Sequence, residues 1–496
     1  MVRAAGHAER VAVVDDHGDW TYGDLLDRSA SLAASLLDGR HDLHDARVLL
    51  LASPGLDYAA ALWGIWRAGG VAVPVSPQQP PAEWAYVAGD SRAAFAIASQ
   101  EQADALTPVA VAAHARLLTC DTRARSARLP HLDPARAALM LYTSGTTSRP
   151  KGVVLTHANI QAQIECLVQA WGWVAEDRIL HVLPLHHTHG VINALACALW
   201  CGAACEMLPA FDVGRTWAGL ASGRISVFMA VPSIYQRLIA AYRAAAPDEQ
   251  RRWADGARGL RLAVSGSAPL PASLFDRWRE LAGQPLLERY GMTEIGMALS
   301  NPLHGDRHRG GVGAPLPGVE VRLVNEAGQD VGDGEPGEIF VRGPGVFAGY
   351  WERPLVTASA FADGGWFKTG DVATRTASGF TILGRMSVDM IKTGGEKVSA
   401  LEVEEMLRAH PAILDCAVVG VPDHEWGERV AAAVVVLPDV SLTLEALRTW
   451  ARPRVAVWKI PSRLAIVTDL PRNTMGKVSK SRLVEMFVTT TGPDPL

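Results

Sequence analysis

The chain has 496 residues, too many for one ordinary hydrophobic core, so we expect two or more domains. Its composition, 49% hydrophobic and 20% charged, is typical of a water-soluble globular protein. The formal net charge of −5, without any run of basic residues, argues against a nucleic-acid partner. No apolar stretch approaches the length that spans a membrane.

Cysteine usage and the first residues of the chain indicate where the protein works. Residues 1–16 are broken by charges and lack the apolar core of a signal peptide. Six scattered cysteines in so long a chain are typical of a reducing compartment. Cys197, Cys201 and Cys205 have helical spacing, but their apolar surroundings favour buried side chains over a metal site. We therefore expect a cytoplasmic protein. The sequence leaves its oligomeric state open between a monomer and a weak homodimer.

The first 136 residues alternate strand and helix patterns. Apolar residues recur at helical spacing in Tyr22–Leu37 and Gly55–Arg67. The segments that read as strands are Val11–Val14, Arg47–Ala52, Val71–Val75 and Phe95–Ala98. This alternation predicts an α/β architecture whose sheets are largely parallel.

A loop rich in hydroxyl groups follows, with the sequence YTSGTTSRPKGV from Tyr142 to Val153. A strand, Ala137–Leu141, precedes it, a strand-like Val153–Leu155 follows, and Thr156 is placed to cap a helix from His157. The loop residues suited to polyphosphate oxygens are Thr143, Ser144, Gly145, Thr146, Thr147 and Lys151. It is not a Walker loop, because Pro150 rather than glycine precedes the lysine.

Three histidines follow the predicted strand Ile179–Leu183. Pro184 ends this strand, and His186, His187 and His189 come directly afterwards. A metal site is conceivable, but no acid or cysteine lies nearby in the sequence, so a pocket lined by imidazoles is the better interpretation.

The predicted strand Ser226–Ala230 leads into a helix through about Ala246. Arg237 lies beside the apolar face of this helix, within about one turn of its start. Its guanidinium can form a surface ion pair or enter a pocket and bind an anion; spacing alone favours the surface.

Two further segments carry polar residues behind predicted strands. The strand Leu260–Val264 leads into a small-residue loop that contains Ser267 and Ala268, with a helix from about Ala272. The second segment, ERYGMTE, runs from Glu288 to Glu294. A carboxylate such as Glu294 suits a Mg²⁺ ion that bridges phosphates.

The last third of the chain contains two regions that differ in composition from the rest and from each other. Residues 305–383 are rich in glycine and proline, with short strands at Val319–Val324 and Glu338–Val341, and end in WFKTGD, whose Asp371 can accept hydrogen bonds from a ribose. Beyond Gly384 we expect a smaller domain, with the hinge near 385–389. Its predicted elements are the helices Ala400–His410 and Leu444–Ala451 and the strands Asp415–Val421 and Val430–Leu437.

Four segments resemble the signature motifs of the adenylate-forming enzymes, and they occur in the same order along the chain. They are the hydroxyl-rich loop, ERYGMTE, WFKTGD and GRMSVDMIKTGG. The resemblance covers essentially the whole chain. It implies a large multi-sheet N-terminal domain, residues 1–384, with two α/β subdomains and a small β-rich one. A small mobile α+β domain, residues 385–496, would follow it.

The same resemblance implies the substrates ATP and coenzyme A, with Mg²⁺ held by Glu294 and Thr146. Catalytic roles fall to Lys477, Glu294, Thr146 and His187. The implied nucleotide-binding residues are Thr143, Ser144, Gly145, Thr146, Thr147, Lys151, Ala268, Glu288, Arg289, Tyr290, Gly291, Met292, Thr293, Asp371, Arg385 and Lys477.

Within that family the chain looks most like the malonate–CoA ligases. The resemblance implies that malonate is bound by Arg237, Ser267, His187, His189 and Met292. It places the coenzyme A tunnel at Lys392, Gly394, Gly395 and Glu396. Three departures from the family pattern stand out: Ser148 for glycine, Glu396 for an aromatic residue, and one extra residue near the predicted pivot Ser387.

The implied reaction joins malonate to coenzyme A through malonyl-AMP, with AMP and pyrophosphate as products. Methylmalonate or another short acid, or a carrier-protein thiol as acceptor, are alternatives within the class. A catalytically silent nucleotide- or acyl-binding protein is the alternative outside it, and the presence of Lys151, Glu294, Asp371 and Lys477 argues against that.

Overall fold

The structure is a computed structural model that describes residues 2–122, 127–143, 149–438, 440–472 and 478–490. The chain forms two compact units. Unit 1 contains 1–307, 313–320 and 341–367, and unit 2 contains 308–312, 321–340 and 368–496. The Gly- and Pro-rich region is thus divided between the units. The domain boundary at 384/385 and the hinge at 385–389 stay predictions.

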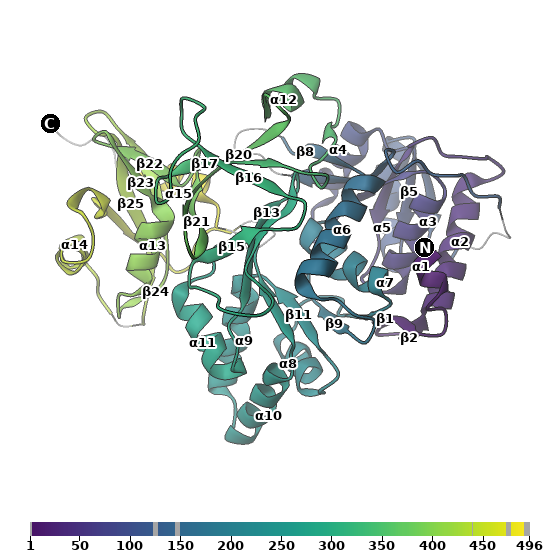
Figure 1. Ribbon diagram of the computed structural model, residues 1–496, viewed down its shortest axis with the longest axis horizontal. Helices are drawn as coiled ribbons and strands as arrows, with labels where there is room; N and C mark the ends of the chain where they lie inside the picture. Colours follow the sequence, from purple (N-terminus) through teal and green to yellow (C-terminus); the bar gives the residue numbers. More distant parts are fainter. Residues whose placement is uncertain (1, 123–126, 144–148, 439, 473–477, 491–496) are drawn as a thin grey trace. The chain divides into compact units, whose positions relative to one another are not determined.

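One sheet of unit 1 has seven strands in the order β18–β8–β7–β4–β3–β5–β6 (Figure 1). Five of its strands, from β7 through β4, β3 and β5 to β6, pair in parallel, as predicted. Its strands are β3 (Arg47–Leu51), β4 (Val71–Pro74), β5 (Phe95–Ala98), β6 (Arg116–Thr119), β7 (Ala137–Thr143), β8 (Lys151–Thr156) and β18 (Gly349–Tyr350). Helices of the same region are α1 (Val2–Ala5), α2 (Tyr22–Leu37), α3 (Leu56–Arg67), α4 (Pro81–Ser91), α5 (Gln100–Ala112) and α12 (Pro354–Ser359).

A second sheet of unit 1 runs β14–β13–β12–β11–β9–β10–β1–β2. Its strands are β1 (Val11–Asp15), β2 (Gly18–Thr21), β9 (Arg178–His181), β10 (Ala204–Met207), β11 (Val227–Ala230), β12 (Leu262–Ser265), β13 (Leu287–Met292) and β14 (Gly296–Ser300). The strands β9, β11, β12 and β13 pair in parallel, so their carboxyl ends meet at one edge. Polar residues that follow these strands are thereby gathered in one place.

Helices cover this second sheet. They are α6 (His157–Trp171), α7 (Cys197–Cys201), α8 (Val213–Ala221), α9 (Pro232–Ala244), α10 (Pro247–Arg258) and α11 (Ala272–Ala282), with the π-helix η1 (His189–Ala196) before α7. Figure 1 shows α8 to α11 grouped beside β11. Trp217, Phe228, Tyr235 and Trp278 are fully buried in this cluster. Burial of such aromatic side chains supplies most of the favourable free energy that holds the helices on the sheet.

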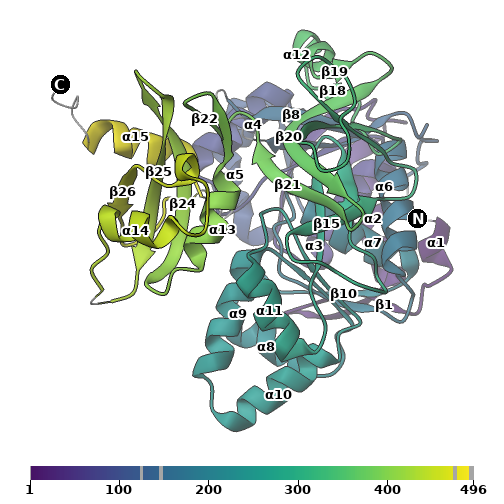
Figure 2. The same ribbon diagram turned by 60° about the vertical axis from the view of Figure 1, so that its left-hand side comes forward.

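Unit 2 contains the strands β16 (Glu320–Val324), β17 (Gly337–Arg342), β20 (Trp366–Thr376) and β21 (Gly379–Arg385), which follow one another in a sheet. The remaining short strands of the chain are β15 (Gly311–Pro315) and β19 (Phe361–Ala362). A separate five-stranded sheet has the order β23–β22–β25–β24, with β26 paired to β25 (Figure 2). Its strands are β22 (Met390–Thr393), β23 (Glu396–Ser399), β24 (Ile413–Asp423), β25 (Gly427–Val436) and β26 (Arg463–Ile466).

The two long strands β24 and β25 are buried on both faces. Val418 and Ala432 belong to the cluster under the helices α13 (Ala400–Arg408) and α14 (Leu444–Ala451). Their neighbours Val419 and Ala431 belong to the cluster under α15 (Lys480–Thr490). Successive side chains of a strand point to opposite faces, so one run of apolar residues serves both layers.

Several predicted boundaries are wrong by a few residues, among them those of β9, α9 and α13. The strand predicted over Ile179–Leu183 is β9, which ends at His181, ahead of Pro184. The helix predicted to reach Ala246 ends at Ala244 because Pro247 forces the residue before it into an extended conformation. The helix predicted over Ala400–His410 ends at Arg408. Among the described residues, no helix has the length and apolar character needed to cross a membrane.

Candidate active site

The hydroxyl-rich loop begins and ends on a β-hairpin. β7 and β8 pair in an antiparallel register with Thr143 opposite Lys151, so the two ends of the loop lie side by side. Thr156 caps α6, as predicted, and accepts a hydrogen bond from the Asn159 backbone at 3.0 Å. The predicted nucleotide-binding residues Ser144, Gly145, Thr146 and Thr147 lie outside the described residues, as does Lys477.

Lys151 and Glu294 are linked through an aromatic ring. The Lys151 ammonium lies 4.5 Å from the centroid of the Tyr350 ring. The Tyr350 hydroxyl donates a hydrogen bond to Glu294 Oε1 at 3.0 Å. The Glu294 residue is only 5% exposed, so this bond orients a buried carboxylate. A cation predicted to bind ATP and a carboxylate predicted to hold Mg²⁺ are therefore held near one another.

A second group of contacts brings together residues from three segments. Ser267 follows β12, and its Oγ lies 3.3 Å from Nδ1 of His189. The same Oγ accepts a hydrogen bond from Arg289 Nη2, on β13, at 3.4 Å. The neighbouring Gly266 leaves room for the guanidinium, since a Cβ there would lie 2.4 Å from Arg289 Cζ.

The backbone at Ser267 is in the left-handed region, with φ of +69°. A side chain other than glycine rarely adopts this conformation, which costs about 1–2 kcal/mol. Strain of this kind persists where the surrounding structure enforces it, often in binding sites. In this left-handed conformation, the Ser267 hydroxyl contacts both His189 and Arg289.

Arg289 is a buried cation. The residue is 3% exposed, and burial lowers the pKa of its guanidinium to about 10, although the neighbouring Glu288 acts in the opposite direction. The guanidinium therefore stays charged at neutral pH. Glu288 itself accepts a hydrogen bond from the Leu270 backbone at 3.1 Å. A desolvated cation gains free energy from an anionic ligand that replaces lost water.

The histidines lie at a tight turn before η1. The rings of His186 and His187 are 4.0 Å apart between centroids. Burial lowers the pKa of His186 to about 4, so its imidazole is neutral at neutral pH. Gly190 is required at this turn because a Cβ would lie 2.2 Å from the Pro184 carbonyl oxygen. His189 is buried and begins η1, and π-helical turns are frequent at functional sites.

The remaining predicted residues of the ERYGMTE segment lie at the end of β13. Tyr290 and Met292 are on the strand and half-buried, and Thr293 follows directly. Gly291 allows close approach of β14, since a Cβ would lie 2.1 Å from the Gly296 carbonyl oxygen. Ala268, also half-buried, follows Ser267.

Arg237 is exposed on α9, and its guanidinium lies 4.8 Å from the ring centroid of Phe211. In the described part of the chain, no acidic side chain forms an ion pair with it. The structure thus places the guanidinium on an aromatic ring rather than in the surface ion pair considered from its spacing. Its contact with malonate stays a prediction.

In unit 2, Asp371 and Arg385 form a paired ion bridge across β20 and β21. Arg385 Nε lies 2.8 Å from Asp371 Oδ1, and Nη2 lies 3.3 Å from Oδ2. The Asp371 backbone N–H also donates to Thr369 Oγ1 at 3.1 Å. The two predicted nucleotide-binding residues are therefore adjacent, and Arg385 fixes the orientation of the carboxylate.

The predicted coenzyme A residues form a two-residue hairpin between β22 and β23. Gly394 and Gly395 have φ of +57° and +85°, as a turn of this type requires. A Cβ at Gly394 would lie 2.8 Å from the ring of Trp426, whose carbonyl accepts the Gly394 N–H at 2.9 Å. The side chains of Lys392 and Glu396 are exposed on either side of the turn.

Three aromatic residues that contact predicted site residues were missed from the sequence: Phe211, Tyr350 and Trp426. Each lies far along the chain from the charged residue or glycine that it contacts, so no local motif marks them. The six cysteines are free thiols. Over the described ranges, no group of three or more histidine, cysteine or acidic residues is arranged to hold a metal ion.

Comparison with protein-family models identifies the class. The model for AMP-binding enzymes matches residues 2–351, and that for the AMP-binding enzyme C-terminal domain matches residues 402–477. The chain therefore belongs to the AMP-binding enzyme family, and its fold is the adenylate-forming enzyme fold, as expected.

Three individual proteins are similar to this chain over nearly its whole length. The mitochondrial malonate–CoA ligase of Xenopus laevis is 44% identical, with 98% of this chain and 91% of the relative covered. The human mitochondrial malonate–CoA ligase is also 44% identical and covers 98% of this chain and 92% of its own. ATP-bound MatB from Rhodopseudomonas palustris superposes with a TM-score of 0.89 at 33% identity, with 98% of both chains covered.

Proposed function

We propose that this protein is an acid–thiol ligase that joins malonate to coenzyme A and consumes ATP. Its family and the malonate–CoA ligases that are 44% identical over nearly the whole chain support this reaction. One observation carries the assignment of the acid. Ser267 Oγ lies 3.3 Å from His189 Nδ1 and 3.4 Å from Arg289 Nη2, so two polar groups and a buried cation gather behind parallel strands, where they suit a second carboxylate.

The first half-reaction would form malonyl-AMP. A malonate carboxylate oxygen attacks the α-phosphorus of ATP, and the bond to pyrophosphate breaks. Lys151 and the hydroxyls of the Tyr142–Val153 loop would bind the phosphate oxygens, Tyr290 would stack on adenine and Thr293 would contact the α-phosphate. Asp371, held by Arg385, would accept hydrogen bonds from the ribose.

Glu294 with Thr146 would hold Mg²⁺. The fit rests on Glu294, whose buried carboxylate is oriented by Tyr350. When bound, the ion neutralises phosphate charge as the pyrophosphate leaves. We assign to Lys477 the role of a cation that bridges the malonate carboxylate and the α-phosphate as negative charge develops between them.

The second half-reaction would transfer the acyl group. The thiolate sulfur of coenzyme A attacks the malonyl carbonyl carbon, and AMP leaves with the electron pair of the broken C–O bond. Gly394 and Gly395 would line the thiol path, because residues without side chains let the pantetheine pass close to the backbone. Lys392 and Glu396 flank that turn.

Malonate specificity would come from pairing of its free carboxylate. An ordinary acyl pocket would bury that group unpaired, which costs free energy. Arg237, Ser267, His187 and His189 are our proposed partners for that carboxylate, and Met292 would line the malonate site. A monocarboxylic acid would leave the cations without an anion and would be rejected for the same reason.

Methylmalonate is a second candidate substrate, since one structural relative of 34% identity and TM-score 0.70 is a malonyl-CoA ligase with methylmalonyl-CoA and AMP bound. Its chain is covered to 97%, and this one to 94%. A cytoplasmic location, a monomer or weak homodimer, and the absence of nucleic-acid and membrane partners stay proposals. The vertebrate relatives, by contrast, are named as mitochondrial proteins.

The proposal is tested by release of pyrophosphate when malonate, ATP and Mg²⁺ are mixed with the protein. Malonate should support release, and propionate, which lacks the second carboxylate, should not. Addition of coenzyme A should then yield a product with the mass of malonyl-CoA. Pyrophosphate release that is equal for both acids would contradict the malonate assignment, and no release with any short acid would contradict the ligase assignment.

A further inference from the structure

The chain on both sides of residues 473–477 is fastened to the body of unit 2. Arg472 and Val478 form an isolated antiparallel bridge, and the Ser479 N–H donates to the Pro471 carbonyl at 2.7 Å. Arg472, which directly precedes residues 473–477, places its Nη2 2.6 Å from Asp415 Oδ2 on β24. The described residues on the two sides of 473–477 are therefore paired with each other and anchored to β24.

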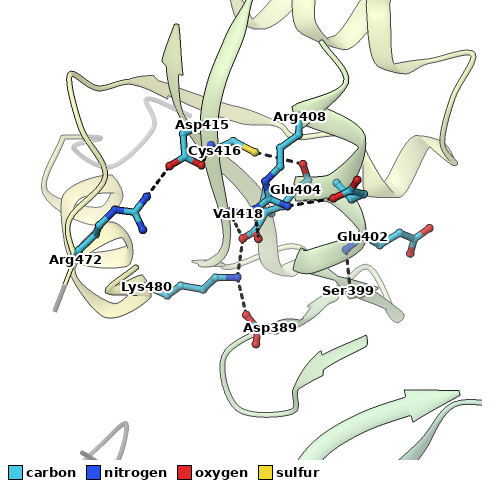
Figure 3. Close-up of polar contacts among 11 residues, drawn as sticks. Asp389, Ser399, Glu402, Glu404, Arg408, Asp415, Cys416, Val418, Arg472 and Lys480 are labelled. Atoms are coloured by element: carbon cyan, nitrogen blue, oxygen red, sulfur yellow. Dashed lines mark hydrogen bonds and ion pairs between the residues drawn. The ribbon is translucent and has the colours of Figure 1, made fainter. Parts of the chain in front are cut away.

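Lys480 anchors the returning side. Its Nζ lies 2.6 Å from Asp389 Oδ1 and 2.8 Å from Glu404 Oε1, as Figure 3 shows. The Lys480 side chain is only 12% exposed. Burial alone lowers the pKa of this lysine, but attraction to Glu404 and Asp389 raises it above its ordinary value. The side chain is therefore a buried cation shared by two carboxylates.

Glu404 connects Lys480 to the core of unit 2. It lies on α13, and its Oε1 also accepts the Val418 N–H of β24 at 2.9 Å. Its Oε2 lies 3.3 Å from Arg408 Nη2 on the same helix. These bonds tie Glu404 to the helix and to the central strand, so its position depends on the core of the unit.

Asp389, the second carboxylate bound to Lys480, belongs to the turn 385–389. Its Oδ2 accepts the Arg385 N–H at 2.9 Å, and its own N–H donates to the Arg385 carbonyl at 2.7 Å. Gly384 makes room for it, since a Cβ there would lie 2.4 Å from Asp389 Cβ. Asp389 thus closes the turn with one carboxylate oxygen and binds Lys480 with the other.

We propose that Lys480 is a positioning residue, which couples the conformation of the turn 385–389 to the position of Val478, the described residue that directly follows Lys477 in the chain. This inference rests on the proposed function, in which Lys477 acts only in malonyl-AMP formation. Because Glu404 holds Lys480 to the core and Asp389 holds it to the turn, the return point at Val478–Lys480 follows the turn. Loss of the tie should therefore impair the first half-reaction more than the second.

The test compares the two half-reactions in single-turnover experiments on the full chain. Malonyl-AMP formation is followed by pyrophosphate release, and thioester formation by conversion of supplied malonyl-AMP with coenzyme A. Lys480→Met should slow the first about ten- to hundredfold, since a displacement of about 1 Å can cost that much, and change the second less than about threefold. Lys480→Arg, which keeps the charge, should recover part of the loss.

Asp389→Asn and Lys459→Met complete the design. Asp389→Asn leaves Lys480 paired with Glu404 but removes the charge at the turn, so it should lower the ratio of the two rates as Lys480→Met does. The double variant should lower that ratio no further, because both changes break one tie. Lys459 Nζ lies 2.6 Å from Glu402 Oε1 of the same helix α13 and belongs to a separate ion pair, so Lys459→Met should leave the ratio unchanged.

A purely structural role would lower Tm and both half-reactions together. The proposal is overturned if Lys480→Met and Asp389→Asn keep the wild-type ratio, or if Lys459→Met lowers that ratio equally. Should Lys480→Met fail to fold, Asp389→Asn alone decides. A wild-type protein that forms no malonyl-AMP would overturn the proposed function instead, so the two failures are distinguishable.

Discussion

Replacement of Arg237 by alanine should weaken the preference for malonate. The guanidinium is exposed and lies 4.8 Å from the Phe211 ring, so water screens part of its charge. A hydrogen bond between charged groups in such a setting contributes about 1.5–3 kcal/mol. The loss in malonate kcat/KM should therefore be about ten- to hundredfold. Arg237→Lys should recover only part, because an ammonium lacks the two-pronged geometry of the guanidinium.

Phe211 provides an internal check on the magnitude. A cation over an aromatic face at an exposed site contributes about 0.5–1 kcal/mol, so Phe211→Leu should cost about two- to fivefold in malonate kcat/KM. The measurement is pyrophosphate release with malonate and with propionate. Arg243, which is exposed near the end of the same helix α9, is the matched control, and Arg243→Ala should change neither value. An Arg237→Ala variant that still prefers malonate to propionate as strongly as the wild type would refute the reasoning.

Four further outcomes are expected. Lys477→Ala should abolish malonyl-AMP formation but still convert supplied malonyl-AMP and coenzyme A; equal loss of both steps would contradict its assigned role. Ser387→Pro should do the reverse, because proline fixes φ and removes the N–H donor at the predicted pivot while it leaves the Asp389–Lys480 pair in place; pyrophosphate exchange and thioester formation separate the two. Gly266→Ala should lower the free energy of unfolding by about 1–3 kcal/mol in chemical denaturation, since its Cβ would lie 2.4 Å from Arg289 Cζ; an unchanged midpoint would mean that the guanidinium moves freely. Burial lowers the pKa of His181 to about 4, below the ordinary value near 6.5, so the unfolded state binds its proton first; the free energy of unfolding should fall as the pH drops from about 6.5 towards 4, and His181→Asn should flatten that part of the profile.

Sequence patterns predicted the elements whose local and tertiary preferences agree. Tyr22–Leu37, Phe95–Ala98 and Leu444–Ala451 have the predicted boundaries because apolar spacing, caps and burial favour the same ends. The parallel pairing and the position of the hydroxyl-rich loop between two strands were also predictable. The family signatures could be placed from sequence because each is a short contiguous segment.

Contacts between distant segments could not be predicted in this way. The π-helix η1 is apolar on almost every side, so its periodicity does not distinguish it from a buried α-helix or strand. The neighbours of Arg237 and Lys480, Phe211 and Asp389, lie far from them in the chain, and no local pattern encodes such a pair. The spacing around Arg237 favoured a surface ion pair, whereas an aromatic ring supplied by the loop before α8 supports the guanidinium.

The left-handed backbone at Ser267 sets stability and substrate choice against each other during evolution. Glycine adopts a φ of +69° without strain, so Ser267→Gly should relax the backbone but delete the hydroxyl between His189 and Arg289. A population selected for thermal tolerance alone would drift to glycine at this position, whereas selection for growth that depends on malonate would retain serine. The residue found at position 267 would thus show whether a lineage had been selected for thermal tolerance or for growth on malonate.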